Sequence, residues 1–316
     1  MKKFMKACTI LAVIMLVLGG ALALAASTVR GSAMITEVVD SVTGGRLHIN
    51  FGNRSIPWGI FWKGGWHYDL NASDIYDDRY PIMQGDVNKY AIDSSVKSLK
   101  IEMGGYIFET RTSADDSFYL TTEGAEKFQC YEEGGVLRLK AVNSNIISFG
   151  ASKGKRITLY IPEAQYFEKV ELELGAGLVT FDSLNAGEVT LEVGAGQIIA
   201  GNILARDLGI SVGAGQIELS EVHVDVLDAE IGMGELMGSG SIQKRARLEC
   251  SMGNMELTLA GRQQDFNYRL EVAAGNLTLG PNSYSGLGRE KDIQNGADKD
   301  MDIECSMGNV TILFKE

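Results

Sequence analysis

The chain has 316 residues and a formal net charge of −12 at pH 7. Its first thirty residues hold four basic and no acidic side chains, so the remainder holds 25 basic and 41 acidic side chains, a net charge of −16. A surface this acidic repels phosphate backbones, which argues against nucleic acid as a partner.

The first thirty residues have the features of a targeting segment. Lys2, Lys3 and Lys6 precede an uncharged run over residues 7–26. As a helix, this run spans about 30 Å, the thickness of a bilayer core. Basic residues on its short side place the N-terminus in the cytoplasm and the rest of the chain outside. We therefore predict a signal-anchor or transmembrane helix over residues 1–30, in a single-pass protein of the bacterial cell membrane with an extracytoplasmic C-terminal domain.

The alternative for this segment is a signal peptide that is cleaved, which makes the protein a secreted one. Ala21-Leu22-Ala23 and Ala23-Leu24-Ala25 both resemble processing sites. The apolar run is longer than the usual core of a signal peptide, which favours the uncleaved anchor. Both interpretations place the bulk of the chain outside the cytoplasm.

Aromatic residues and glycines are concentrated in residues 31–90, which we predict to be a juxtamembrane and capping region. All three tryptophans, Trp58, Trp62 and Trp66, lie here together with Tyr68. One interpretation, which we favour, is a segment that packs over the open end of a repeat domain, since terminal repeats need caps. The other is an aromatic platform for glycans or for the membrane interface, with these four residues as the candidate interaction site.

Alternating apolar and polar residues, the pattern of a β-strand, begin after residue 90. They run over residues 96–103 and again over residues 136–140. The phrase Ile101-Glu102-Met103-Gly-Gly looks like a worn copy of clearer repeats that follow. No linker rich in proline or serine interrupts this half of the chain. We predict one β-solenoid domain over residues 91–316, with regular repeats over residues 168–316.

A short phrase recurs in the second half of the chain: apolar, polar, apolar, then Gly-Ala-Gly or a close variant. Its closing glycine returns every nineteen residues from Gly177 to Gly253, and two further copies follow at longer spacing. A fixed period near twenty residues is typical of a solenoid. The predicted corners of the coils are Gly175, Gly177, Gly194, Gly196, Gly213, Gly215, Gly232, Gly234, Gly253, Gly275 and Gly308.

The residues around each small triplet predict the local structure. Apolar residues two apart on both sides indicate short strands, and the triplet permits a tight corner that a Cβ would obstruct. We therefore predict an all-β fold, a single-stranded β-helix with coils of about 19 residues. Stacked coils share a core that no single coil can bury alone. We expect successive coils to stack in chain order, with neighbouring strands about 4.8 Å apart.

Two cysteines occupy the inward repeat position of Val193, namely Cys250 and Cys305. In chain order the coil that carries Val272 lies between them, so we expect their Cα atoms to be about 9.6 Å apart. That distance exceeds the ~7 Å reach of a disulfide. We predict two buried thiols that do not form a bridge.

One outward repeat position is glutamate in six copies: Glu173, Glu192, Glu230, Glu249, Glu271 and Glu304. Like charges at strand spacing destabilise a sheet, so the repetition needs a reason. The favoured interpretation is a solvated row that discourages aggregation; the alternative is a stripe that binds cations or cationic peptides. Another repeat position holds Asn254, Asn276 and Asn309, which we expect to form a structural ladder of stacked amides.

Recognisable catalytic and cofactor motifs are missing from the sequence. Histidine occurs only at His48, His67 and His223, far apart and outside any ligand spacing, which argues against zinc and against His-based catalysis. No phosphate loop, dinucleotide glycine motif or GxSxG elbow is present. We predict a protein that is not an enzyme, with no catalytic residue, no cofactor and no metal site. A β-helix enzyme that degrades polysaccharides is the least favoured alternative.

The run over residues 157–198, ITLYIPEAQYFEKVELELGAGLVTFDSLNAGEVTLEVGAGQI, resembles the bacterial putative-adhesin family, a domain of unknown function with β-strand repeats. In that family a lysine-bearing membrane segment often precedes an extracytoplasmic solenoid with repeated Gly-Ala-Gly phrases. The resemblance covers residues 91–316 and brings no catalytic residues. It implies a non-enzymatic surface interaction or adhesion module with a glycan, cell-wall or protein partner; the alternative is an envelope scaffold or a stress-sensing component.

Overall fold

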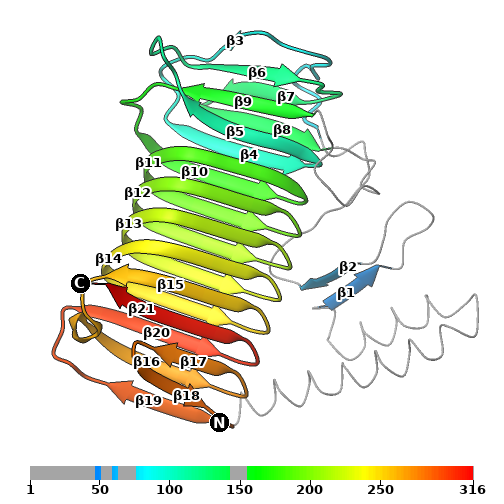
Figure 1. Cartoon of the computed structure of the whole chain (residues 1–316). Coiled ribbons are helices and arrows are strands. Elements are labelled where there is room, and N and C mark those ends of the chain that lie inside the picture. Colours follow the sequence, from blue (N-terminus) through cyan, green and yellow to red (C-terminus); the bar gives the residue numbers. More distant parts are fainter. Residues whose placement is uncertain (1–46, 51–58, 63–75, 143–154, 316) are drawn as a thin grey trace, which may run out of the picture. The chain divides into compact units, whose positions relative to one another are not determined.

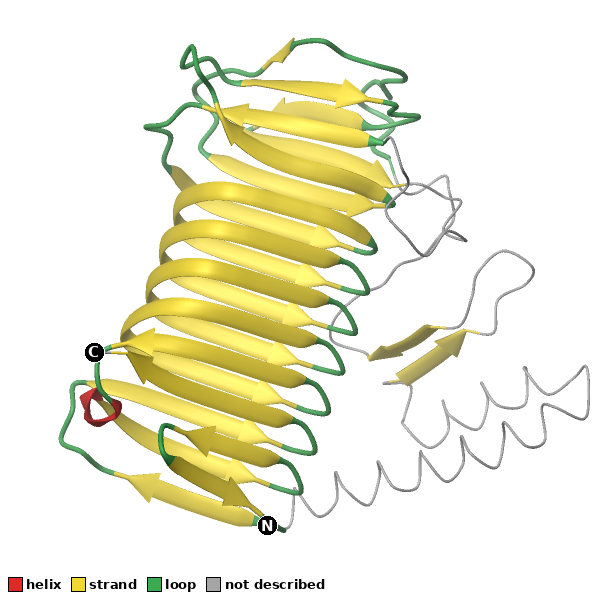
Figure 2. Ribbon diagram, in the orientation of Figure 1, coloured by secondary structure: helices red, strands yellow, loops and turns green. Residues whose placement is uncertain are grey.

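The computed structural model describes residues 47–50, 59–62, 76–142 and 155–315 (Figures 1 and 2). Contacts divide the chain into two units, one that ends at Asp74 and one that covers Ile75–Glu316. In the first unit, β1 (Leu47–Asn50) pairs antiparallel with β2 (Gly59–Trp62). Within the described ranges no helix has the length and apolar character needed to cross a membrane, and the predicted helix over residues 1–30 lies outside those ranges.

The second unit is built almost entirely of strands, and its described part contains one 3-10 turn, η1 (Gln263–Asp265). The strands are β3 (Tyr90–Ala91), β4 (Ser98–Gly104), β5 (Tyr106–Thr112), β6 (Tyr119–Glu123), β7 (Gln129–Glu133), β8 (Val136–Val142), β9 (Arg156–Ile161), β10 (Phe167–Leu174), β11 (Gly177–Val193), β12 (Gln197–Val212), β13 (Gln216–Ile231), β14 (Glu235–Cys250), β15 (Asn254–Ala260), β16 (Phe266–Val272), β17 (Asn276–Leu279), β18 (Asn282–Ser285), β19 (Arg289–Ile293), β20 (Lys299–Cys305) and β21 (Asn309–Lys315). The predicted all-β solenoid architecture is confirmed.

Alternation of apolar and polar residues gives each strand one buried face. In β11, Val189, Leu191 and Val193 are buried while the residues between them are partly exposed. Leu191 pairs in register with Leu172 of β10 and with Ile210 of β12, each nineteen residues away. Because every coil presents the same face to the interior, the apolar side chains stack into one continuous core.

The four long strands β11–β14 each curve through a complete coil between one corner and the next (Figure 1). They pair in parallel with their neighbours on both sides. The worn phrase around Glu102 is part of the same stack, since β4 pairs in parallel with β10 and places Glu102 beside Glu173. The region before the regular repeats therefore continues the solenoid.

The coils do not stack in chain order at either end. At the C-terminal end, β20 lies between β14 and β16, and β21 lies between β15 and β17. At the other end, β4 lies between β8 and β10, and β5 lies between β9 and β11. The first and the last coil of the chain are each inserted one place inside an end of the stack. The expectation of a stack in chain order was wrong.

This insertion also corrects the expected position of the cysteines. Cys305 is the register partner of Cys250 on one side and of Val272 on the other. The two cysteines are thus on neighbouring strands, about 4.8 Å apart rather than about 9.6 Å. Both cysteines are buried and free, as predicted.

Antiparallel strands cover both ends of the stack. At the C-terminal end β18 pairs with β17 and β19 pairs with β16. At the other end β7 pairs with β8, β6 pairs with β9, and β3 pairs with β6. The side chains of β19 alternate in charge from Arg289 to Asp292 and are exposed. Polar strands of this kind cover an edge that could otherwise recruit another chain.

Candidate functional site

The outward glutamates lie in register on neighbouring strands and form one row, which we call the acidic ladder. In stack order its members are Glu102, Glu173, Glu192, Ser211, Glu230, Glu249, Glu304 and Glu271. Glu102 was not included in the predicted column, although its phrase had been recognised as a worn repeat. The order at the C-terminal end follows from the inserted coil, which places Glu304 between Glu249 and Glu271.

Basic side chains neutralise parts of the acidic ladder. Lys140 Nζ lies 2.6 Å from Glu102 Oε2, and Lys100 Nζ lies 3.7 Å from Glu173 Oε1. Further along, Arg247 Nε donates a hydrogen bond of 2.8 Å to Glu249 Oε1. No basic side chain in the described ranges forms an ion pair with Glu192 or Glu230. Glu304 and Glu271 form none in these ranges either, so the uncompensated charge lies at the centre of the ladder and at its C-terminal end.

Several carboxyl groups of the acidic ladder bind protons more readily than an isolated glutamate. Burial raises the pKa of Glu173, and the neighbouring Glu102 raises it further. The pKa of Glu192 is raised by burial and then by Glu173. The pKa of Glu304 is raised by burial and then by Glu249 and Glu271. Each of these shifts means that the charged ladder is unfavourable by itself, so a bound cation would stabilise it.

A second row of side chains follows the corners, and hydrogen bonds join neighbouring members of it. Gln216 Nε2 donates to Glu235 Oε2 at 3.2 Å, and Asn254 Nδ2 donates to Glu235 Oε1 at 3.0 Å. Asn276 Nδ2 donates to Asn309 Oδ1 at 3.0 Å. The stacked amides predicted from the sequence are present, with Asn309 between Asn254 and Asn276. Because these groups bond to one another, we assign the row to coil stacking.

The corner glycines are required mainly by close stacking and not by unusual dihedral angles. Of the predicted corners, Gly177 alone has a positive φ, 129°. A Cβ on Gly196 would lie 2.7 Å from Leu174 Cδ2, and a Cβ on Gly308 would lie 2.6 Å from Cys250 Sγ. The first position of the triplet is less crowded, since a Cβ on Gly213 would lie 3.0 Å from the nearest atom. That difference explains why serine stands at the first position of later corners and never at the last.

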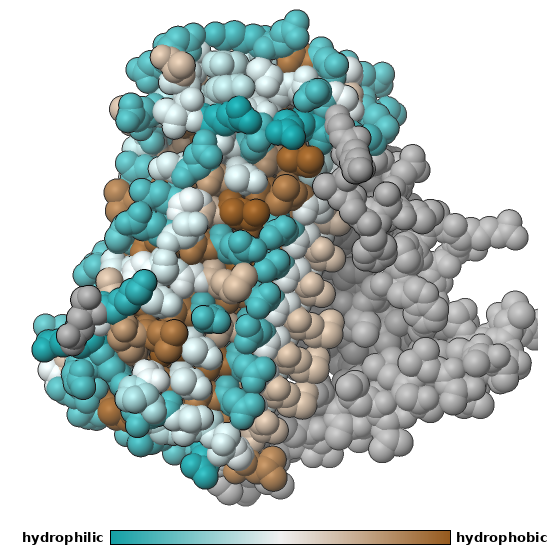
Figure 3. All heavy atoms as spheres, in the orientation of Figure 1, coloured by the Kyte–Doolittle hydropathy of each residue, from teal (hydrophilic) through white to brown (hydrophobic). Residues whose placement is uncertain are grey.

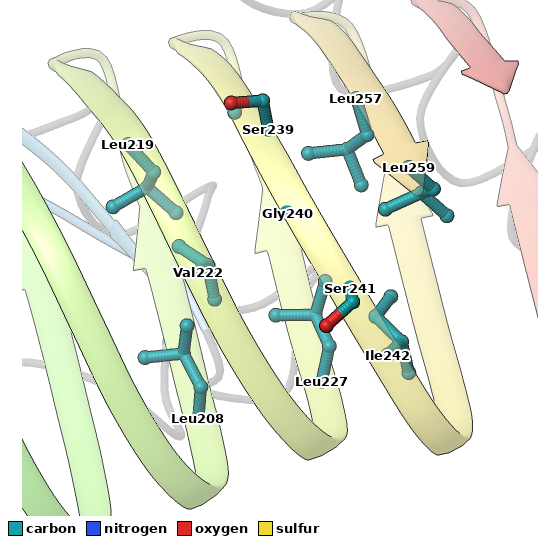
Figure 4. Close-up of a pocket in the computed structure, with 11 residues that line it drawn as sticks. Leu208, Leu219, Val222, Leu227, Ser239, Gly240, Ser241, Ile242, Leu257 and Leu259 are labelled. Atoms are coloured by element: carbon teal, nitrogen blue, oxygen red, sulfur yellow. The ribbon is translucent and has the colours of Figure 1, made fainter. Parts of the chain in front are cut away.

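One small apolar cavity lies inside the solenoid beside β14 (Figure 4). Gly238 and Gly240 occupy inward positions where the neighbouring coils carry Leu219, Leu257 and Val222. The missing side chains leave about 20 Å³, lined by Leu208, Leu219, Val222, Leu227, Gly238, Ser239, Gly240, Ser241, Ile242, Leu257 and Leu259. That volume is close to one water-sized sphere, so the cavity is too small for an organic ligand.

The structure links one histidine to two side chains that its sequence position did not suggest. His223 Nδ1 lies 2.9 Å from Ser241 Oγ, and His223 Nε2 lies 3.1 Å from Glu221 Oε1. Glu221 and His223 are two residues apart on one strand face, and Ser241 follows on the next coil across an irregular register. The side chains of His223 and Glu221 are 45% and 63% exposed. A nucleophilic serine needs a shielded site with oxyanion donors, so we interpret this group as a surface hydrogen-bond chain.

The predicted aromatic interaction site falls largely outside the described part of the chain. Trp58, Trp66 and Tyr68 belong to ranges that the structure does not describe. Trp62 is the last residue of β2. Among the described residues, no group of three or more His, Cys, Asp or Glu side chains is arranged to hold a metal ion.

Comparison with known proteins finds a matching family model and similar solved structures. A family model described as Toastrack DUF4097 matches residues 96–232. Among solved structures, a putative adhesin from Bacteroides fragilis is 12% identical with a TM-score of 0.37, and the match covers 74% of this chain and 97% of that one. A putative lipid binding protein from Parabacteroides distasonis is 15% identical with a TM-score of 0.39, and the match covers 72% of this chain and 96% of that one. A putative cell adhesion protein from Clostridium sporogenes is 10% identical with a TM-score of 0.30, and the match covers 72% of this chain and 98% of that one.

No curated protein matches the chain. The match to the family model begins just before β4 and ends in the corner after β13, within the parallel stack described above. The resemblance to a β-strand-repeat domain of unknown function is thereby confirmed. The matched residues, 96–232, are similar to the Toastrack DUF4097 family.

Proposed function

We propose that this protein is a non-enzymatic interaction module whose solenoid presents the acidic ladder to a cationic partner outside the cell. The observation that carries the proposal is the register of seven glutamates along one face, with Glu192 and Glu230 lacking ion pairs among the described residues. Glutamates at neighbouring register positions destabilise a sheet, and a chain of positive groups would remove that repulsion. The partner class that fits is a cationic peptide or an amine-bearing polymer.

The rigidity of the solenoid supports this assignment. The ladder repeats at about 4.8 Å along a stack held by backbone hydrogen bonds, so the spacing of its charges is fixed before binding. A fixed charge array loses little conformational entropy when an extended partner binds along it. Solenoids commonly use extended faces of this kind for binding.

The covered ends weigh against the alternative of a scaffold that grows by coil-on-coil stacking. β18 and β19 cover one end, and β3, β6 and β7 cover the other, so the parallel edges of the last coils are already paired. A role in sensing envelope stress is compatible with an interaction module, because a sensor of this class also needs a partner.

The binding test uses the full chain in detergent micelles and a hexalysine peptide as probe, measured by calorimetry at low and high salt. The ladder variant Glu192→Gln/Glu230→Gln/Glu304→Gln is compared with Glu163→Gln/Asp182→Asn/Glu256→Gln, which removes three exposed carboxylates elsewhere. We expect the ladder variant to lose affinity by about tenfold and the control by less than about twofold. An equal loss in both would show that net charge alone attracts the peptide, which contradicts a specific site.

The proposed location at the cell membrane is tested separately. We propose that residues 1–30 remain as an anchor with the solenoid outside, because the basic residues precede a long uncharged run. Membranes from cells that express the full chain are washed with alkaline carbonate, and intact cells are treated with protease. Retention in the membrane with digestion of the solenoid is the expected result; release of a shortened chain into the medium would support the cleaved signal peptide instead.

A further inference from the structure

Three methionine side chains form an exposed row on the corners of the solenoid, which we call the thioether row. Met233, Met252 and Met307 are the middle residues of three corner triplets. These three residues are 59%, 42% and 46% exposed. By contrast Met255 and Met301 are fully buried in the core. Figure 3 shows a row of pale-brown spheres, a colour that alanine and methionine share, along the edge where Figure 2 draws the corner turns in green.

Backbone hydrogen bonds place the three methionines on directly neighbouring corners. The amide of Met252 donates to the carbonyl oxygen of Gly232 at 2.8 Å, and the amide of Met307 donates to that of Ser251 at 2.7 Å. Each bond joins a corner methionine to the first residue of the neighbouring corner triplet in the stack. Neighbouring corners are therefore separated by the strand spacing of about 4.8 Å.

The row is continuous only because the last coil is inserted into the stack. Along the chain, the middle corner residues run Met233, Met252, Ala274, Met307, so an alanine interrupts them. In the stack, Ala274 lies beyond Met307, since its amide bonds to the carbonyl oxygen of Ser306. On the other side the neighbour is Ala214, since the amide of Met233 donates to the carbonyl oxygen of Gly213, the first residue of that corner. Alanines thus bound a block of three thioethers.

The surroundings of the thioether row favour a soft ligand. Each methionine is followed by a glycine and preceded by a glycine or serine, so no bulky neighbour in the triplet covers the sulfur. The thiols of Cys250 and Cys305 lie on the inner side of the same corners, and burial raises the pKa of Cys250 to about 11. Those thiols stay protonated at neutral pH and face the core. The exposed sulfur ligands at these corners are therefore thioethers.

The backbone spacing of the corners is about twice the length of a metal–sulfur bond, which lets neighbouring side chains hold one ion between them. Two sulfurs about 4.8 Å apart can hold one ion midway between them, about 2.4 Å from each, which is close to the ~2.3 Å of a zinc–thiolate bond. Thioether sulfur is a soft, neutral ligand that selects Cu(I) over hard cations such as Mg²⁺ and Ca²⁺.

We propose that Met233, Met252 and Met307 form a binding site for a soft monovalent cation of the Cu(I) type. The ion is held by thioether coordination, with no change of oxidation state and no proton released. Met252 is the central ligand because it has a methionine on both sides. The site is independent of the acidic ladder, whose carboxylates are hard ligands on a strand face.

The test uses the full chain with Ag(I), a redox-stable analogue of Cu(I), titrated by calorimetry in chloride-free buffer. All proteins carry Cys8→Ser, since the thiol at that position would bind silver itself. Leucine replaces methionine because it keeps the apolar volume and removes the sulfur. We expect Met252→Leu to weaken binding by at least about tenfold, because it leaves two sulfurs about 9.6 Å apart that cannot share an ion. Met233→Leu and Met307→Leu each leave an adjacent pair and should cost less.

A rescue variant tests whether binding depends on three methionines at adjacent corners. In Met233→Leu/Ala274→Met, the row becomes residues 252, 307 and 274, so three adjacent thioethers are restored one step further along the stack. We expect its Ag(I) affinity to return to within about twofold of the unmodified row. The matched control Met255→Leu changes a buried methionine of the neighbouring strand and should leave the affinity unchanged.

A measurement on the unmodified residues keeps the proposal falsifiable if a variant folds poorly. In protein labelled with carbon-13 at the methionine methyl groups, Ag(I) should shift the signals of the three exposed methionines and leave those of Met103, Met255 and Met301 in place. Unchanged signals from the exposed row, equal affinity of Met252→Leu, or displacement of Ag(I) by equimolar Ca²⁺ would each overturn the proposal.

Discussion

Cys250 and Cys305 are register partners on neighbouring parallel strands, although the coil that carries Val272 lies between them along the chain. The relationship arises because β20 inserts between β14 and β16. It also brings Met307 beside Met252, Asn309 beside Asn254 and Glu304 beside Glu249. One topological step therefore decides the order of every side-chain row at this end of the solenoid.

The inserted coil can be tested by cross-linking outward positions. In Glu249→Cys/Glu304→Cys the new thiols occupy neighbouring register positions, whereas in Glu249→Cys/Glu271→Cys one strand separates them. A disulfide needs Cα atoms within about 7 Å, and the two separations are about 4.8 Å and about 9.6 Å. After mild oxidation, peptide mapping should find a bridge in the first variant only. A bridge in the second variant alone would indicate a stack in chain order.

The crowding at the corners predicts opposite outcomes for two glycines of one triplet. A Cβ on Gly234 would lie 2.5 Å from Val212 Cγ1 and 3.1 Å from the amide nitrogen of Gly215. We expect Gly234→Ala to lower the free energy of unfolding by about 2 kcal/mol or more. Gly232→Ser should cost less than about 1 kcal/mol, because serine stands at this position in two other corners. Thermal or denaturant unfolding checks both, and equal costs would contradict the packing argument.

The cavity beside β14 predicts a second contrast between neighbouring glycines. A Cβ on Gly238 would point among side chains, with Leu257 Cδ2 at 3.2 Å and Leu219 Cβ at 3.4 Å. Gly238→Ala should raise the free energy of unfolding by up to about 1 kcal/mol, since it fills space and restricts the unfolded chain. Gly240 has φ 154°, and a Cβ there would collide with the backbone of Val222. Gly240→Ala should destabilise by about 2 kcal/mol or more, as measured by urea unfolding.

The acidic ladder predicts a pH dependence with a defined sign. The pKa of Glu192 is raised in the folded protein, first by burial and then by Glu173. A raised pKa means that the folded state binds the proton more tightly than the unfolded state, so this group favours folding below its ordinary pKa of about 4.3. That contribution is lost as the pH rises through the folded-state value. Glu192→Gln should therefore raise the melting temperature at pH 7 by about 1 °C or more and have little effect near pH 4.

The control for this measurement is Glu163→Gln, which removes an exposed carboxylate from the turn before β10. It changes the net charge by the same amount without changing the acidic ladder. A melting-temperature difference that is as large for Glu163→Gln, or that grows towards pH 4 for Glu192→Gln, would contradict the assigned cause.

Much of the site could be found in the sequence because it repeats. The period of nineteen residues places Glu173 beside Glu192 and Val193 beside Val212, and the structure has both pairs. Glu102 was missed as a ladder member because its repeat carries no Gly-Ala-Gly phrase and no nineteen-residue spacing to Glu173. His223 and Ser241 were missed as partners because a register shift between β13 and β14 makes them eighteen residues apart.

The sequence by itself determined the coil: alternation decides which side chains face the core, and small corner residues decide where each coil turns, since both depend on contacts within one repeat and its copy. Only the tertiary structure decided the order of the coils at the two ends. Inward positions of different coils carry similar apolar residues, so any of several orders buries the core equally well. The order is chosen by the connections and by the covering strands β18 and β19, whose contacts have no period in the sequence. That choice places the three methionines of the thioether row side by side.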